Sequence, residues 1–80
     1  MTLTEASQQR IRELCRERNI TLNHLSMLCG MTQSTVHNIF ARPNNSPTIS
    51  TIKKICDGLD ITLGEFFQTE YFDTLEQELQ

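Results

Sequence analysis

The sequence predicts an all-α protein made of short helices. Through most of the chain, apolar residues recur at intervals of three and four, which gathers them on one side of a helix. Such runs are preceded by residues whose hydroxyl can cap a first helical turn, namely Thr2, Thr21, Thr32 and Thr62. Gly30, Asp60 and the segment with both prolines separate the runs, as residues that end helices do.

Length and hydropathy favour one small domain. Eighty residues can bury only part of their surface, roughly 60 to 65 per cent at this size, so self-association is a reasonable expectation. We assign residues 1–68 to the domain and residues 69–80 to an acidic amphipathic tail. The chain has no long apolar run and no basic-then-apolar leader, so we expect a cytoplasmic protein without a membrane span.

The first helix is expected from about Leu3 to Arg18. Thr2 and Glu5 have the spacing of a capping box, in which each side chain bonds the backbone N–H of the other residue. The apolar side should face inward with Ile11, Leu14 and Cys15. The charged side should face water with Arg12, Glu13, Arg16 and Glu17.

A short helix capped by Thr21 should follow and end at Gly30. One of its faces gathers Leu22, Leu25, Ser26, Leu28 and Cys29. The left-handed backbone that ends many helices favours a residue without a Cβ, which explains Gly30 at this point.

The next helix, from Gln33 to Ala41 behind the cap Thr32, has two unlike faces. Its apolar side carries Val36, Ile39 and Phe40. Its other side carries Gln33, Ser34, His37 and Asn38. These side chains donate and accept hydrogen bonds, as reading base edges in a DNA major groove requires. Two helices joined by a short glycine-containing turn, with such a face on the second, are typical of a helix-turn-helix.

For the rest of the domain, the sequence predicts a loop followed by two helices. Residues 42–48 are a polar, proline-containing loop. A helix from about Ile49 to Leu59 should bury Ile49, Ile52, Ile55, Cys56 and Leu59. Asp60 tolerates the left-handed backbone that ends this helix. Thr62 and Glu65 then form a second capping box, ahead of the core residues Leu63, Phe66 and Phe67.

Residues 10–67 resemble the Cro and lambda-repressor type of helix-turn-helix domain, also called the XRE family. The resemblance is carried by RIREL at 10–14, NIT at 19–21, Ser26, Gly30, TQSTV at 32–36, TIKKICDGLDIT at 51–62 and EFF at 65–67. It implies a five-helix lambda-repressor-like DNA-binding domain, here with an acidic C-terminal extension that can form a sixth helix. It further implies a transcriptional regulator, as a rule a repressor, that binds a palindromic site on double-stranded DNA as a homodimer.

The chain departs from the family at two points. Many members form a buried ion pair between an Arg where Cys15 stands and a Glu where Phe40 stands, and both positions are apolar here. Exchange of both partners for packed apolar groups is tolerated, so we expect Cys15 and Phe40 in one apolar cluster. Leu22 replaces a Gln that holds a backbone phosphate in the family, a change that weakens this anchoring.

The resemblance and the chemistry of the side chains together suggest which residues contact DNA. Base contacts are expected from Gln33, Ser34, His37 and Asn38. Backbone contacts are expected from Arg10, Arg12, Thr21, Asn23, Thr32, Thr35, Arg42 and Asn44. The alternatives remain that Arg10, Arg12 and His37 are merely solvated and that the loop after Ala41 is only a connector.

Charge is divided unevenly along the chain. The net charge of the whole chain is −3, but residues 1–54 contain seven basic and three acidic residues and are therefore basic. Residues 55–80 hold seven acidic residues and no basic one. The helix-turn-helix therefore lies in a basic part, and the acidity belongs to a separable end.

The tail has three interpretations. Phe67, Tyr71, Leu75 and Leu79 recur every fourth residue, which indicates an acidic amphipathic helix. It can fold onto its own domain, pair with the same tail in a dimer, or remain disordered. An alternative function, that of a protein-binding adaptor or antitoxin, would use residues 69–80 as the contact surface.

Other chemistry finds no support in the sequence. The three cysteines form no CxxC pair and have no histidine at ligand spacing, so we expect buried thiols without a disulfide or a metal. No nucleophile is paired with a base, and no glycine-rich phosphate loop is present. We therefore expect no catalytic residue and no cofactor.

Overall fold

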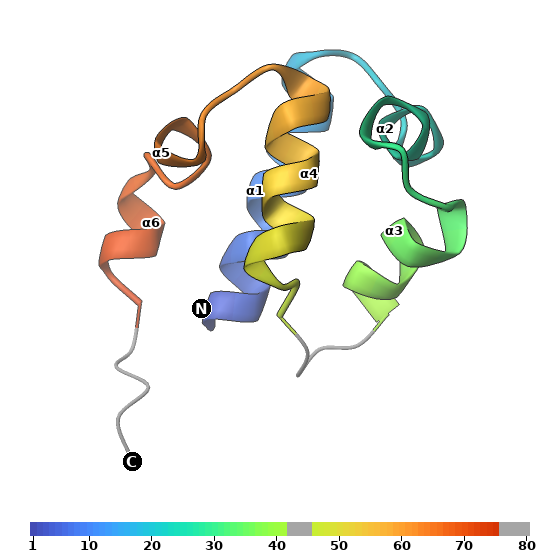
Figure 1. The fold of residues 1–80 in the computed structure, drawn as a ribbon. Helices are drawn as coiled ribbons and strands as arrows, with labels where there is room; N and C mark the ends of the chain where they lie inside the picture. The colour runs from blue at the N-terminus through green and yellow to red at the C-terminus, as the bar shows by residue number, and fades with distance from the viewer. Residues whose placement is uncertain (42–45, 76–80) are drawn as a thin grey trace.

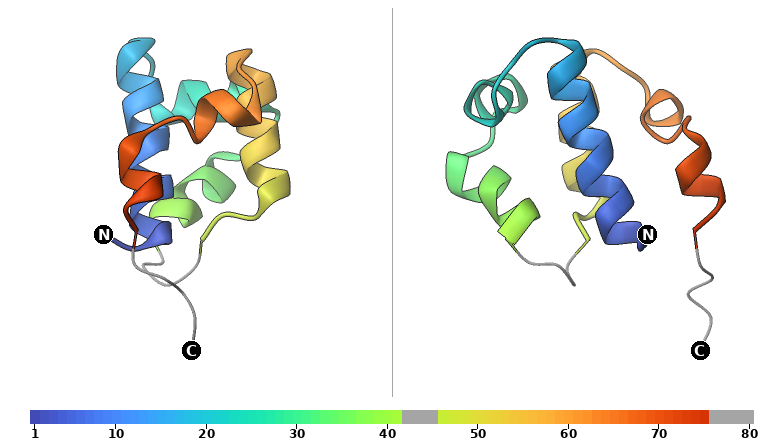
Figure 2. Two further views of the ribbon diagram at one scale, coloured as in Figure 1. Left: turned by 90° about the vertical axis from the view of Figure 1, so that its left-hand side faces the viewer. Right: turned by 180° about the vertical axis from the view of Figure 1, so that it is seen from behind.

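Two helices form the middle of the molecule and the others flank them. The computed structural model describes residues 1–41 and 46–75, and within these ranges every regular element is a helix. α1 (Leu3–Glu17) and α4 (Ile49–Leu59) lie in the middle (Figure 1). α2 (Leu22–Cys29) and α3 (Gln33–Ala41) are on one side, and α5 (Leu63–Phe66) and α6 (Glu70–Asp73) are on the other. The view from behind in Figure 2 shows the same order with α1 in front. The prediction of an all-α fold is confirmed.

Local hydrogen bonds account for where the helices begin. In both predicted capping boxes, Thr2 with Glu5 and Thr62 with Glu65, each side chain bonds the other residue's backbone N–H at 2.9 to 3.1 Å. These bonds to threonine N–H groups lower the pKa of both glutamates below the ordinary value of a carboxyl group.

Left-handed residues account for where several helices end. Gly30 and Asp60 have φ of 66° and 58°, as predicted. Asn19, which the sequence analysis did not identify as a left-handed residue, has φ of 55° and turns the chain between α1 and α2.

The core lies between the middle helices and their neighbours. It is built from residues that are less than one-tenth exposed: Ile11, Leu14, Cys15, Leu25, Val36, Ile39, Ile52, Ile55, Cys56, Leu59 and Phe66. Phe40 is half-buried and packs against this cluster, which contains Cys15, so the expected apolar grouping of Cys15 and Phe40 is confirmed. All three cysteines are free thiols. Burial raises the pKa of Cys29 to about 11 and raises that of Cys15 and Cys56 as well.

Three predicted orientations are wrong. Leu28 is 46% exposed, because the inward stripe of α2 is the narrower set 22, 25, 26 and 29. Ile49 is 62% exposed, because it is the first residue of α4 and lies outside the packed stripe that starts at Ile52. Glu13 is half-buried, because α6 covers it.

Aromatic residues join α5 and α6 to the domain. The rings of Phe66 and Phe67 meet edge to face at 4.9 Å, and those of Phe67 and Phe72 at 5.0 Å. The Tyr71 hydroxyl donates a hydrogen bond of 2.6 Å to Oε1 of Glu13 on α1. This part of the tail folds onto its own domain, the first of the three interpretations. Leu79 lies outside the described residues.

Candidate nucleic-acid interface

The turn between α2 and α3 is held by its own backbone and one threonine. The Met31 N–H donates to the Ser26 carbonyl at 2.9 Å across the left-handed Gly30. Thr32 then starts α3, since its hydroxyl oxygen accepts the Thr35 N–H at 3.1 Å. The predicted helix-turn-helix is therefore present with the expected cap and the expected glycine.

α3 separates its apolar and polar residues as predicted. Val36 is fully buried and Ile39 is 7% exposed, which fixes the rotation of the helix about its axis. On the other side Gln33, Ser34, His37 and Asn38 are exposed. The two pairs 33 with 37 and 34 with 38 are each one turn apart and form adjacent rows. A helix of nine residues is roughly 13 Å long, and an α-helix fits the major groove of B-form DNA.

Hydroxyl and amide groups lie exposed where α2 and α3 begin. They belong to Thr21, Asn23, Thr32 and Thr35. The Thr21 oxygen accepts the His24 N–H at 3.0 Å, which leaves its proton to donate to a phosphate. Leu22 is half-buried against the core and offers no hydrogen bond from its side chain. The hydrogen-bonding groups at the start of α2 are therefore those of Thr21, Asn23 and the backbone.

The two arginines near the middle of α1 face opposite ways. Arg10 donates from Nε to the Phe66 carbonyl at 2.6 Å and from Nη2 to the Glu65 carbonyl at 2.8 Å, which places it at α5. Arg12 lies over the Phe40 ring at 4.3 Å, which places it at α3. Only Arg12 is therefore on the helix-turn-helix side. Arg42 and Asn44 lie outside the described residues.

A hollow beside α3 brings in residues that the sequence analysis missed. Its volume is about 260 Å³, and its walls include Thr35 and Asn38 of α3, Thr51 of α4, and Ser46 and Thr48 from the segment that leads into α4. In the sequence, these residues could have been noticed as the serines and threonines within 46–51. The same residues are equally typical of a helix cap. Indeed, the Thr48 oxygen accepts the Thr51 N–H at 3.2 Å.

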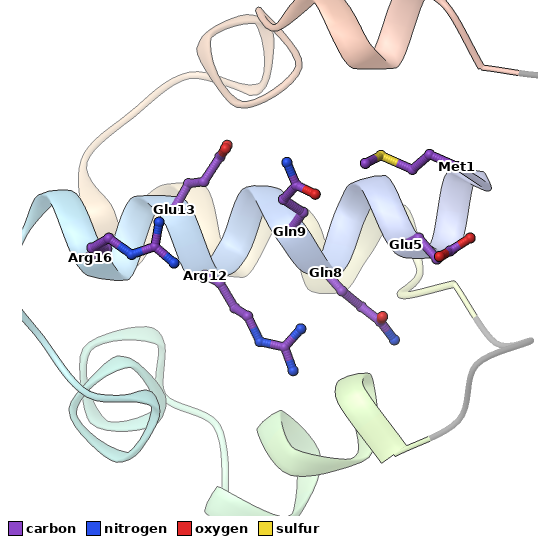
Figure 3. A pocket seen from close by; sticks show the side chains of 7 residues that line it. All are labelled: Met1, Glu5, Gln8, Gln9, Arg12, Glu13 and Arg16. Atoms are coloured by element: carbon purple, nitrogen blue, oxygen red, sulfur yellow. The ribbon is translucent and has the colours of Figure 1, made fainter.

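A larger hollow, of about 400 Å³, runs along the outer side of α1 (Figure 3). Apart from Met1, its lining comes from α1 alone and mixes acidic, basic and amide side chains. A small-molecule site is usually lined by polar groups that converge from several elements. This hollow lacks that arrangement, because a single helix supplies nearly all of its lining. In the described ranges, no three His, Cys, Asp or Glu residues come together as metal ligands, and no helix is long and apolar enough to cross a membrane.

These features define a class of protein, the helix-turn-helix DNA-binding domains. A family model described as a Cro/C1-type helix-turn-helix DNA-binding domain matches residues 10–71, and the chain belongs to this family. The family is a DNA-binding regulatory one and not a family of enzymes. The chain is therefore a DNA-binding regulator that acts on double-stranded DNA.

A solved structure agrees with this assignment. The crystal structure of the prophage Lp1 protein 11 is similar to this chain with 33% sequence identity and a TM-score of 0.82. The similarity covers 94% of this chain and 99% of the prophage protein. No curated protein matched the sequence.

Proposed function

We propose that the protein is a transcriptional repressor that reads a specific DNA sequence in the major groove with α3. The observation that carries this proposal is the division of α3 into a buried face with Val36 and Ile39 and an exposed face with Gln33 and His37. An exposed row of hydrogen-bonding side chains on a helix at the edge of the molecule can enter a groove without any rearrangement of the core.

Base readout is assigned to four side chains. The Gln33 amide can pair with N6 and N7 of an adenine, an arrangement that distinguishes this base from the other three. Ser34 reaches a base edge or a phosphate close to the same helix end. His37 and Asn38, one turn further, extend the contacts along the groove.

Backbone contacts hold the helix in register. We assign them to the exposed groups at the starts of α2 and α3, namely Thr21, Asn23, Thr32 and Thr35. The positive end of the α2 dipole favours a phosphate at the same place. Arg10 is left out of the set, since its guanidinium bonds the α5 carbonyls.

We further propose that two copies bind together. One such helix offers too few contacts for tight and selective binding, and a twofold dimer doubles them. Its two α3 helices would then enter major grooves about 34 to 36 Å apart, on a palindromic site. A dimer bound over a promoter blocks transcription by occupancy alone, which favours repression. The prophage origin of the similar structure supports an action on bacterial or phage DNA in the cytoplasm.

The test is selection from a library of randomised duplexes, followed by binding measurements at several salt concentrations. The proposal predicts enrichment of one palindrome and an affinity that falls steeply as salt is raised. Sedimentation of the complex should then give two protein chains per duplex. The absence of binding even at low salt would refute the proposal and favour the adaptor alternative. Binding without enrichment would refute sequence-specific reading.

A further inference from the structure

Two side chains of α1 contact the last turn of α3. The Gln8 amide donates from Nε2 to the Ile39 carbonyl oxygen at 2.8 Å. The Arg12 guanidinium carbon lies 4.3 Å from the centre of the Phe40 ring. Gln8 and Arg12 are one helical turn apart, and both point toward α3 in Figure 3, whereas Gln9 and Glu13 point the other way.

Both contacts suit the end of a helix. Ile39 is among the last four residues of α3, whose carbonyls have no partner within the helix, and Gln8 supplies one from outside. The carbonyl end of a helix is its negative end, which favours a cation such as Arg12 nearby. The flat guanidinium also covers the face of the Phe40 ring.

These contacts act at the opposite end of α3 from its cap. The N-terminal end of α3 is held by Thr32 and the turn at Gly30. Its C-terminal end is held by Gln8 and Arg12. A helix held at one end can tilt, and a tilt moves every exposed side chain relative to a groove. We infer that Gln8 and Arg12 are positioning residues for DNA reading, which set the angle at which α3 meets the duplex. This inference rests on the proposed function.

The competing role for Arg12 is a direct phosphate contact, and the two roles give different salt dependence. Loss of a phosphate contact weakens binding to all sequences and reduces the slope of log affinity against log salt by about one. Loss of a positioning contact weakens the selected duplex more than random duplex and leaves the slope unchanged, because no counterion release is lost.

The experiment compares Gln8→Met and Arg12→Met with the controls Gln9→Met and Arg16→Met. The controls make the same changes at exposed positions of α1 whose side chains are not among those that contact the end of α3. The probes are the duplex selected by the unaltered protein and a random duplex. We expect the affinity ratio of the two probes to fall roughly three- to tenfold in Gln8→Met, the range that follows from one lost hydrogen bond. In Arg12→Met we expect a fall of roughly two- to fivefold, from one lost cation–π contact. The controls should stay within about twofold.

Amide hydrogen exchange without DNA gives a second readout. Each test variant should exchange faster in the last turn of α3, with α2 and α4 protected as before, which separates local loosening from failure to fold. An unchanged affinity ratio, or a salt slope lowered by about one in Arg12→Met, would overturn the inference. If the unaltered protein selects no duplex, the proposed function fails, and unchanged exchange in α3 then overturns the positioning role by itself.

Discussion

Gly58 of α4 lies directly against Cys29 of α2. A Cβ placed on Gly58 would be 2.6 Å from the Cys29 sulfur and 2.9 Å from the Leu28 carbonyl oxygen. Separations this short do not occur between real side chains and backbone, so only a hydrogen at this position lets the two helices approach. This contact fixes the distance between α4 and the first helix of the DNA-binding motif.

We therefore predict that Gly58→Ala destabilises the protein. The overlap includes backbone atoms that cannot move without shifting α2, so its cost exceeds the gain of about 1 kcal/mol that alanine brings to a helix. A net loss of up to about 2 kcal/mol is expected in urea unfolding, from an overpacking cost of about 1–3 kcal/mol less the alanine gain. Gly64→Ala is the matched control, because its new Cβ would meet nothing closer than 3.8 Å and Gly64 also lies in a helix, so this variant should gain up to about 1 kcal/mol. Equal stability of the two variants would show that α2 and α4 are not tightly packed.

Tyr71 should titrate at unusually high pH. Burial, followed by the hydrogen bond to Glu13 and the charge of that carboxylate, raises its pKa to about 12 from an ordinary value of 10. Because the folded pKa is the higher one, the stability from this group is complete below pH 10 and is lost as pH rises through about 12. The chain has one tyrosine and no tryptophan, so tyrosinate absorbance reports on this residue alone.

Glu13→Gln separates the effect of burial on the pKa of Tyr71 from the effect of the Glu13 carboxylate. It removes the carboxylate while leaving the ring covered, so the midpoint should fall but remain above 10, since burial is the larger cause. A midpoint near 10 in the folded parent protein would mean that α6 is not docked on α1.

Gln33→Ala should relax the choice of one base pair in each half-site. A bidentate pairing between an amide and adenine contributes roughly 1–3 kcal/mol of discrimination, so preference at that position should fall by about that amount. Competition binding with singly substituted duplexes measures this directly. Gln9→Ala, an exposed glutamine on α1, is the control and should leave every preference intact. Identical preferences in both variants would place the reading surface elsewhere.

Glu65 should contribute to loss of stability in acid. Its pKa is lowered below 4.5 by the hydrogen bond from the Thr62 N–H and the Thr62 hydroxyl. A group with a lowered folded pKa stabilises above its unfolded pKa and loses that contribution as pH falls below it. Glu65→Gln keeps an acceptor in the capping box without the titration, so thermal stability should depend less on pH between about 5 and 3. An unchanged pH dependence in Glu65→Gln would mean that the capping box does not form in solution.

Sequence and structure agree best where a few neighbouring residues decide the outcome. The caps at Thr2 and Thr62 and the left-handed residues Gly30 and Asp60 depend on hydrogen bonds and backbone angles within one helical turn. The polar face of α3 follows from periodicity alone, since Val36 and Ile39 must turn inward together. The exposure of the candidate reading residues was therefore predictable.

What only the tertiary structure decided concerns contacts between distant segments. Arg10 and Arg12 are alike in type and close in sequence, yet one bonds α5 and the other covers Phe40. Glu13 was expected in water and instead accepts a hydrogen bond from Tyr71, 58 positions away. Helical periodicity predicts which side chains share a face of a helix, but it does not predict which other element packs against that face. That choice is made by the packing of all the helices at once, and here it also determined which residues of α1 hold the end of α3.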